Sequence, residues 1–202
     1  MIRLLVSGTN TEVGKTWFCG FLARHFREQG KVVRYVKPVQ TGCPPDDDAA
    51  VVREISGLSE SEAFIVNTAV EPVAPCFLYD PFPFEETVAV INEITDCDVL
   101  IVESAGGLLV PLDSERQNYH FAKACDLDIA LVVPNRLGCL NDAQLNMRFI
   151  ALEGLPLHGL AMNDFFASDE INRVRNKDML EVLYPECVRY ELGADGLSLV
   201  GE

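Results

Sequence analysis

The sequence IRLLVSGTNTEVGKTW, residues 2–17, decides the fold of this chain. Residues 2–7 form a short apolar run that stops at a glycine, which is typical of a buried strand. A loop bounded by Gly8 and Gly14 follows, and apolar residues then recur at helical spacing over residues 16–29. Because the N–H groups of such a loop converge on phosphates at the N-terminus of the next helix, this segment predicts a phosphate-binding loop.

Two side chains of the same segment favour a nucleoside triphosphate bound with magnesium. Lys15 can reach the β- and γ-phosphates, and the Thr16 hydroxyl can ligate Mg²⁺. Five residues separate Gly8 from Gly14, whereas four separate the glycines of the usual loop, so the segment is a variant of that loop. The alternative is a strand–turn–helix junction whose lysine is simply exposed on the surface.

Beyond this segment, apolar runs and amphipathic stretches alternate along the chain. They predict strands at residues 32–36, 98–103, 128–133 and 157–162, and helices near residues 46–55, 85–94 and 142–152. Strands that are apolar throughout and separated by helices indicate an α/β fold, with a mostly parallel sheet covered by helices on both faces. We expect one P-loop NTPase-like domain over residues 1–202, with the proline-rich residues 72–83 as an irregular surface segment.

The composition argues against several other classes of protein. Sixteen Lys and Arg residues stand against 31 Asp and Glu residues, and the net charge of −15 disfavours nucleic acid or a membrane as a partner. No apolar run approaches the ~18 residues of a membrane span, and the first run is shorter than the ~7–15 residues of a secretory signal, so we expect a cytoplasmic protein. The 7 cysteines form no C-x-x-C pair and predict reduced, mostly packed thiols, while the 3 histidines lack metal-ligand spacing.

Charged residues that follow the predicted strands are candidates for the chemistry, because ligands of parallel sheets bind beyond the carboxyl ends of the strands. Lys37 can project its charge towards the phosphates, although taken alone it is more simply a solvated lysine before a turn. Glu103 stands where a P-loop enzyme needs a Mg²⁺ ligand. Asp48 is a candidate second ligand, and the alternative is that Asp46–Asp48 only caps a helix.

Asn163 and Asp164 follow the last predicted strand. A side-chain amide can both donate to and accept from the edge of an adenine ring, so Asn163 is a candidate for base recognition. The alternative is an Asx turn that closes the strand.

Together these residues resemble the dethiobiotin synthetase family, ATP-dependent enzymes that close the ureido ring in biotin synthesis. The matching segments are GTNTEVGKT (8–16), KPVQTG (37–42), DA (48–49), VESAGG (102–107), PL (111–112), RLGCLNDAQLN (136–146) and AMND (161–164). They stand in the family's order over residues 2–164, and the five-residue spacing between Gly8 and Gly14 is the family's own form of the loop. The resemblance implies that 7,8-diaminopelargonate, CO₂ and ATP are the substrates, with Mg²⁺ as cofactor.

The resemblance also implies a role for each matching residue. ATP would be bound by Glu12, Val13, Gly14, Lys15, Thr16, Trp17, Asp48, Glu103, Ser104, Ala105, Gly106, Asn163 and Asp164. Of these, Thr16, Asp48 and Glu103 would be the Mg²⁺ ligands. Lys37 and Lys15 would be the catalytic residues. The diamine or its carbamate would contact Thr11, Thr41, Gly138, Cys139, Leu140 and Asn141.

The residues around Asn141 suggest a homodimer with shared active sites. By sequence Asn141 is the N-cap of a helix, with Gln144 three residues on, and the simple interpretation is a capping box. The N-terminus of a helix also attracts carboxylates, and the diamine carries one. The resemblance places this helix start in the active site of the neighbouring subunit.

Three departures from the family pattern concern the substrates. Asn10 replaces a frequent aspartate, and Cys76 replaces a frequent histidine. Residues 190–195 lack the family's usual G-E-I-P segment against the base. We therefore expect adenine recognition to rest mainly on Asn163, with weak discrimination between nucleobases.

Two other classes share the loop and the sheet. An amidotransferase-type synthetase generally carries a glutaminase domain, for which the stretch after residue 164 offers no room and no nucleophile module. A ParA-like nucleotide switch usually has a second lysine early in the loop, where this chain has residues 9–12, TNTE. Both alternatives are therefore disfavoured relative to the synthetase.

Overall fold

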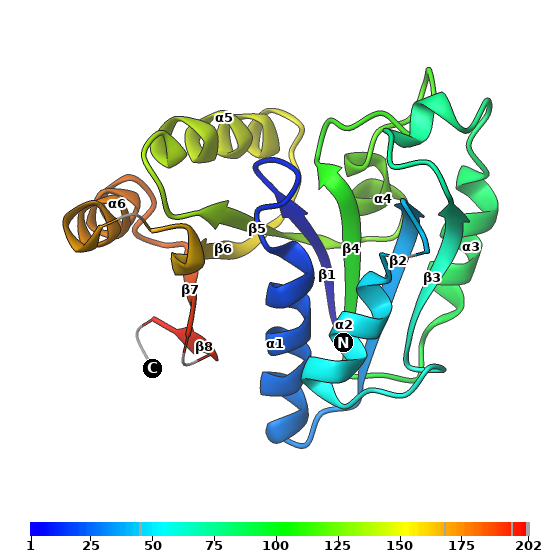
Figure 1. The fold of residues 1–202 in the computed structure, drawn as a ribbon, viewed down its shortest axis with the longest axis horizontal. Coiled ribbons are helices and arrows are strands. Elements are labelled where there is room, and N and C mark those ends of the chain that lie inside the picture. The colour runs from blue at the N-terminus through cyan, green and yellow to red at the C-terminus, as the bar shows by residue number, and fades with distance from the viewer. Residues whose placement is uncertain (45, 168, 195, 201–202) are drawn as a thin grey trace.

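The computed structural model describes residues 1–44, 46–167, 169–194 and 196–200, which build a single eight-stranded sheet (Figure 1). The strands are β1 Ile2–Gly8, β2 Val33–Thr41, β3 Ala63–Ala69, β4 Val99–Gly107, β5 Asp128–Pro134, β6 Leu157–Asn163, β7 Val188–Gly193 and β8 Gly196–Leu199. Their order is β3-β2-β4-β1-β5-β6-β7-β8, and all neighbours are parallel except β7 and β8. The predicted α/β class with a mostly parallel sheet is confirmed. That one domain spans residues 1–202 stays a prediction.

Helices cover both faces of the sheet because the strands are apolar on both sides. The helices are α1 Lys15–Glu28, α2 Asp48–Ser56, α3 Phe84–Glu93, α4 Tyr119–Ala124, α5 Cys139–Leu152 and α6 Glu170–Leu183. On β1, Leu4 points into a core that includes Phe18 of α1, while Leu5 belongs to the core on the other face. That second core contains Phe121 of α4 and Met147 of α5. Helices α1 and α2 thus share one face, and α3 to α6 the other.

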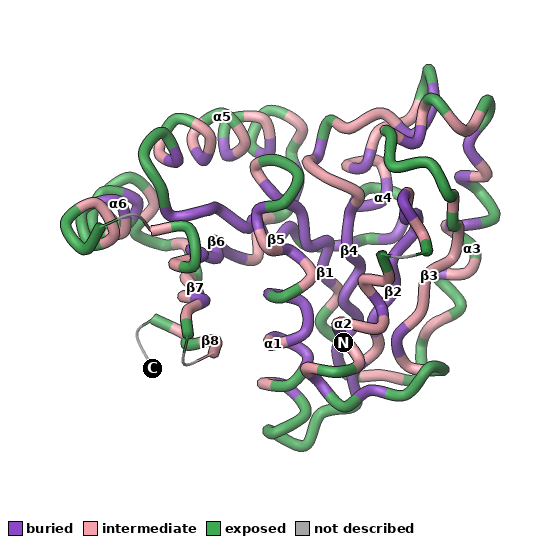
Figure 2. The backbone as a smooth tube through the Cα atoms, viewed as in Figure 1, coloured by how far each residue is buried: buried purple, intermediate pink, exposed green. Residues whose placement is uncertain are grey.

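The burial pattern follows these two layers (Figure 2). The central strands run through the molecule as buried backbone, and the outward sides of α5 and α6 are exposed. All seven cysteines are free thiols, and three of them are fully buried, as predicted: Cys19, Cys125 and Cys139. No helix in the described ranges is both long and apolar enough to cross a membrane.

Several elements escaped the sequence analysis: β3, α4, α6, β7 and β8. Most lie towards the borders of the sheet, where burial is incomplete and the apolar signal is weak. In β3 only Ala63 is buried, and in α6 only Asn176 and Leu180 are. Asp195, in the segment that departs from the family pattern, lies outside the described residues, but residues 190–193 lie in β7, between β6 and the edge strand β8.

The predicted cap of the helix after β5 is wrong. Helix α5 begins at Cys139 and is preceded by Gly138, whose φ of 94° no other residue adopts easily. Asn141 lies in the first turn, where its backbone N–H donates to the carbonyl of Gly138 and its side chain caps no helix N–H. A glycine in the left-handed conformation starts this helix three residues earlier than a capping box at Asn141 would, since the N-cap is Gly138.

Candidate active site

The phosphate-binding loop lies between the carboxyl end of β1 and the start of α1, at the top of α1 in Figure 1. Gly14 has a φ of +91°, and a Cβ atom there would lie 2.1 Å from Nδ2 of Asn163. That amide comes from the end of β6 and donates to the carbonyl oxygen of Val13 at 2.9 Å. The strand β6 therefore holds the loop by a buried hydrogen bond, and only glycine fits at position 14.

Four charged side chains meet at the mouth of this loop. The ammonium of Lys37 donates to Oε1 of Glu103 at 2.9 Å and also pairs with the carboxylate of Asp48. Glu103 is 0% exposed, Lys37 4% and Lys15 6%, so these charges lie almost fully out of water. The hydroxyls of Thr16 and Tyr35 each donate to Glu103, at 2.9 and 2.8 Å.

The register of the sheet brings these groups together. Glu103 on β4 stands beside Val6 on β1, just before the loop. On the other side of β4 runs β2, which carries Tyr35 and Lys37. Side chains that are far apart in the sequence therefore converge at one edge of the sheet, as expected for the carboxyl ends of parallel strands.

The electrostatics of the cluster keep its charges in place. Burial lowers the pKa of Lys37, but the charges of Glu103 and Asp48 outweigh burial and raise this pKa well above its ordinary value. Burial raises the pKa of Glu103, but Lys37 and Lys15 outweigh burial and hold it below its usual value. Burial lowers the pKa of Lys15, and the charge of Lys37 lowers it further, against the attraction of Glu103. Lys15 thus gains most from an incoming anion.

Two of the simpler alternatives fail at this site. Lys37 is not a solvated lysine, because β2 continues to Thr41 and buries it. Asp48 is not the helix cap either. Asp47 takes that role, and its carboxylate accepts from the N–H of Ala50 at 2.8 Å, which leaves the carboxylate of Asp48 to pair with Lys37.

A cavity of about 1090 Å³ opens in front of this cluster. It is lined by thirteen of the residues singled out from the sequence: Thr11, Glu12, Gly14, Lys15, Thr16, Trp17, Lys37, Thr41, Asp48, Glu103, Ala105, Gly106 and Asn163. Val13 and Ser104 lie behind the wall as buried residues, and Ser104 donates to the carbonyl oxygen of Gly106. Six of the thirteen come from a single segment, residues 11–17.

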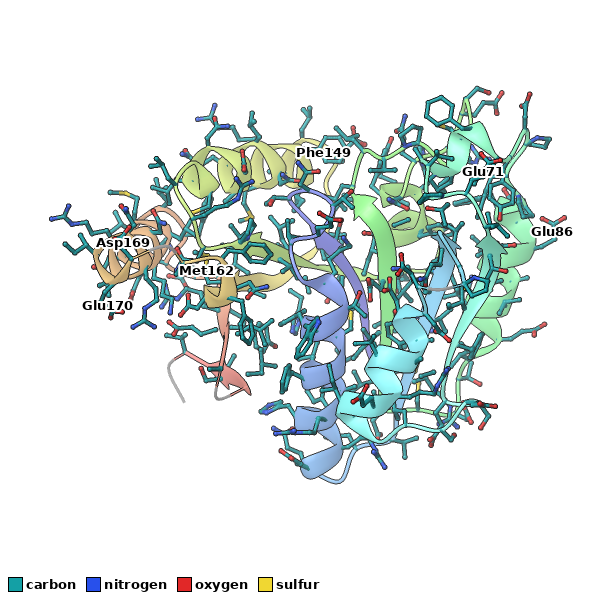
Figure 3. All side chains as sticks on the ribbon, in the orientation of Figure 1. Glu71, Glu86, Phe149, Met162, Asp169 and Glu170 are labelled. Atoms are coloured by element: carbon teal, nitrogen blue, oxygen red, sulfur yellow. The ribbon has the colours of Figure 1, made fainter. Side chains whose placement is uncertain are left out.

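Other residues singled out from the sequence lie outside this wall. The described lining of the cavity does not include residues 138–141 of the same chain, and Cys139 is fully buried. Asp164 points away from the cavity into a polar network. Its carboxylate accepts from Asn135 and pairs with Arg173 and Lys177 at 2.8, 3.1 and 2.7 Å. Asp169 and Glu170, labelled in Figure 3, mark the start of the helix that supplies this network.

The sequence analysis missed several residues of the site. Tyr35 gave no signal because it stands inside an apolar strand, and its contact with Glu103 spans 68 positions. Gln40 holds the start of α2 by accepting from the N–H of Asp48, although it lies within the matching segment at residues 37–42. Phe165 and Phe166 also line the cavity. They follow Asn163 and Asp164, and the sequence analysis considered only these two polar residues.

The donor set fits a magnesium ion. The carboxylates of Asp48 and Glu103 both pair with the ammonium of Lys37, so they lie close together. The Thr16 hydroxyl lies 2.9 Å from Oε1 of Glu103. No three His, Cys, Asp or Glu side chains converge as a metal site within the described ranges. The protein would thus supply two carboxylates and one hydroxyl, which suits Mg²⁺ because this ion keeps waters and phosphate oxygens as its other ligands.

Comparisons with known proteins first define the class. The model of the AAA domain family matches residues 2–185. Chloroplast FtsY from Physcomitrella patens shares the fold with a TM-score of 0.59 at 18% identity, covering 98% of this chain and 61% of that one. The FtsY of Elizabethkingia anophelis also shares the fold, with a TM-score of 0.59 at 19% identity, covering 95% of this chain and 58% of that one. The chain spans about three fifths of these structures and has the fold of a P-loop nucleotide-binding domain.

More similar relatives define the family within this class. Proteins named ATP-dependent dethiobiotin synthetase BioD are 35% identical in Nitrosospira multiformis, over 78% of this chain and 74% of the relative. The Bacillus cereus relative is 33% identical over 91% of this chain and 79% of the relative. The Bacillus subtilis relative is 30% identical over 91% of this chain and 83% of the relative. The chain belongs to the ATP-dependent dethiobiotin synthetase family.

Proposed function

We propose that this chain forms dethiobiotin from 7,8-diaminopelargonate, CO₂ and ATP. Family membership supports the reaction, and one observation of the structure ties it to particular residues. Lys15 at the start of α1 and Lys37 on β2 both line the cavity at the phosphate-binding loop, among carboxylates that pair with Lys37. Two cations at one point suit a reaction in which two anions must meet.

In the proposed reaction, one amine of the diamine captures CO₂ as a carbamate. The carbamate oxygen attacks the γ-phosphate of ATP and ADP leaves, which gives a carbamic–phosphoric anhydride. The second amine then attacks the carbamoyl carbon, closes the ring and expels phosphate. Lys15 contacts the γ-phosphate, and Lys37 contacts the carbamate and the transferring phosphoryl group. Together they offset the repulsion between the two anions and stabilise the charge of the transition state.

The remaining roles at the phosphate end follow from position. Thr16, Asp48 and Glu103 would hold Mg²⁺, which supplies positive charge to the triphosphate. Residues 12–17 would bind the phosphates, and the small residues Ala105 and Gly106 let them approach the sheet. Thr11 and Thr41 line the same cavity and would contact the carbamate. A cytoplasmic location is part of the proposal, since the reaction depends on the ATP pool.

The assay that tests the function is release of phosphate from ATP. We expect release to require both the diamine and bicarbonate, and to yield one dethiobiotin per phosphate. Release without the diamine would favour a nucleotide switch of the ParA-like kind. Release that requires glutamine or ammonia in place of bicarbonate would favour an amidotransferase-type synthetase.

We also propose that the enzyme is a homodimer with shared active sites. Residues 138–141 do not line the cavity of their own chain, which supports a place in the site of a second subunit. In that site the first turn of α5 would bind the far carboxylate of the diamine, because the N-terminus of a helix attracts anions. Replacement of Asn141 by Ala should then raise the KM for the diamine and leave ATP affinity unchanged.

A subunit-mixing experiment tests the shared site. Subunits with Lys15→Ala and subunits with Asn141→Ala are each nearly inactive at low diamine concentration. In a mixed dimer one site carries both changes and the other carries neither. Random pairing should restore about a quarter of the wild-type sites in a two-fold dimer. Full exchange of subunits without recovery of activity would contradict the proposal.

A further inference from the structure

Three aromatic side chains are exposed where the cavity is lined by the start of α1 and by the residues that follow β6. Trp17, Phe165 and Phe166 are 51%, 55% and 38% exposed, and all three line the cavity. The rings of Trp17 and Phe165 lie 6.1 Å apart between centroids, at an angle of 57°. Large apolar rings left in water side by side mark a binding surface more often than a structural one. We call these three residues the aromatic surface.

The aromatic surface lies within a nucleotide's reach of the phosphates. Trp17 is in the first turn of α1, directly after Lys15 and Thr16. Phe165 and Phe166 lie just after the end of β6, which closes with Asn163. A Cβ atom on Gly14 would lie 3.9 Å from the ring of Phe166, so this ring is close to the loop itself. A base attached to a triphosphate in the loop would therefore lie among these rings.

The polar side chains near the aromatic surface are already occupied. Nδ2 of Asn163 donates to Val13, and its Oδ1 accepts from the N–H of Phe165 at 3.1 Å. Both carboxylate oxygens of Asp164 are bonded to Asn135, Arg173 and Lys177. One N–H and one lone pair of this amide thus serve the protein, and Asn163 is only 2% exposed, so its remaining N–H and lone pair have little access to the edge of a base. The rings of Trp17 and Phe165, in contrast, remain about half exposed, although the Trp17 ring also lies beside Phe21.

We propose that Trp17 and Phe165 bind the nucleobase by stacking on its face, so that the site discriminates weakly between bases. The stacking proposal rests on the proposed function in one respect, namely that a nucleoside triphosphate binds in the cavity. Every nucleobase has a π-face, so stacking tolerates a change of base where edge hydrogen bonds do not. The enzyme then uses ATP, GTP and CTP with similar efficiency, and Trp17 serves the base as well as the adjoining phosphates.

The only tryptophan of the chain provides a direct test, because Trp17 itself belongs to the aromatic surface. Titration of the wild-type protein with ADP, GDP and CDP should quench its fluorescence, with dissociation constants within about tenfold of one another. Inorganic tripolyphosphate, which has no base, should displace each nucleotide and remove the quenching. A preference for ADP beyond ~10³-fold would mean that an edge is recognised after all and would overturn the proposal.

Variants separate stacking from support of the loop. Calorimetric titration of Trp17→Leu and Phe165→Ala should show all three nucleotides bound about 10- to 100-fold more weakly, as for loss of one stacked base, with tripolyphosphate binding unchanged. Phe165→Tyr keeps the ring and should bind nucleotides normally. Phe77→Ala is the matched control, because Phe77 is 78% exposed and does not belong to the described lining of the cavity.

Two results would contradict the stacking role. Unchanged nucleotide affinity in both variants would remove the rings from the site, and an equal loss of tripolyphosphate affinity would make them supports of the loop. These measurements need no diamine, so the two proposals can fail separately. Weak discrimination among nucleotides together with absent diamine-dependent phosphate release would keep the aromatic surface and reject the synthetase reaction.

Discussion

In the proposed site, the two ends of the cavity would bind their groups by opposite means. At the phosphate end, Lys37 and Glu103 are buried charges that are paired with each other and are hard to replace. At the base end, Trp17 and Phe165 are exposed rings whose polar neighbours serve the protein itself. On this proposal the phosphate end determines the chemistry, whereas the base end determines only how tightly a nucleotide is held. Changes at the two ends should therefore have effects of different kind and size.

The largest effect is expected from Lys37→Met. Loss of a cation that contacts the transferring phosphoryl group should lower kcat by ~10²-fold or more. Loss of the buried pair should also reduce the free energy of unfolding by about 3–5 kcal/mol, because Glu103 and Asp48 then face each other unpaired. A solvated lysine, which is the simpler interpretation of Lys37 from the sequence, would leave stability unchanged. Chemical denaturation and diamine-dependent turnover measure the two losses.

Lys31→Met is the matched control for this variant, since Lys31 is exposed and should change neither quantity. A Lys37→Met protein that keeps most of its turnover would remove Lys37 from the mechanism. Normal stability of that protein would show that the carboxylates do not need the ammonium.

Magnesium binding should depend on Asp48. In the presence of ADP, Asp48→Asn should weaken Mg²⁺ binding by at least about tenfold, because one of two charged ligands is lost. Calorimetric titration with MgCl₂ measures this affinity without any turnover. Asp46→Asn is the control, because Asp46 lines the same cavity but does not pair with Lys37. Equal affinity in the Asp48 and Asp46 variants would mean that another group holds the ion.

Asn163→Ala should affect both ends of the cavity, because Asn163 lines the cavity beside the aromatic surface and also donates a hydrogen bond to the phosphate loop. Loss of its bond to Val13 loosens the phosphate loop, so kcat/KM should fall by about tenfold for ATP, GTP and CTP alike. A fall confined to ATP would instead support the sequence-based prediction that Asn163 recognises adenine. The ratio of the three kcat/KM values decides between the two roles, whatever the absolute loss.

The smallest effect concerns acid stability, to which Glu103 at the phosphate end and Asp164 outside the cavity both contribute. Salt bridges and hydrogen bonds hold the pKa values of Glu103 and Asp164 below their ordinary values of 4.5 and 3.8, against the effect of burial. A carboxylate with a lowered folded pKa stabilises the protein above its unfolded pKa, and this stabilisation is lost as the pH falls through the folded value. Between pH 6 and 3 the unfolding free energy should therefore fall less steeply in Asp164→Asn and Glu103→Gln than in the wild type. Glu54→Gln, an exposed control, should follow the wild-type curve, and parallel curves for all four proteins would contradict the assignment.

The sequence by itself determined the elements that rest on neighbouring residues. The buried strands β1, β4, β5 and β6 are continuous apolar runs, and the loop before α1 shows its glycines and its lysine within a few positions. Such patterns are local, because the burial of a strand and the bend of a loop depend on residues that follow one another in the chain. The elements β3, α6 and β7, towards the borders of the sheet, are half exposed and left no comparable pattern.

Only the tertiary structure decided what the polar residues do. Lys37 and Glu103 are 66 positions apart, and Asn163 and Val13 are 150 apart, yet each pair shares a buried hydrogen bond. A lysine that follows a strand has the same local sequence whether it is solvated or paired, and an asparagine looks the same whether it recognises a base or holds a loop. The physical reason is that burial fixes the partner of a polar group, and burial depends on which strands become neighbours in the sheet.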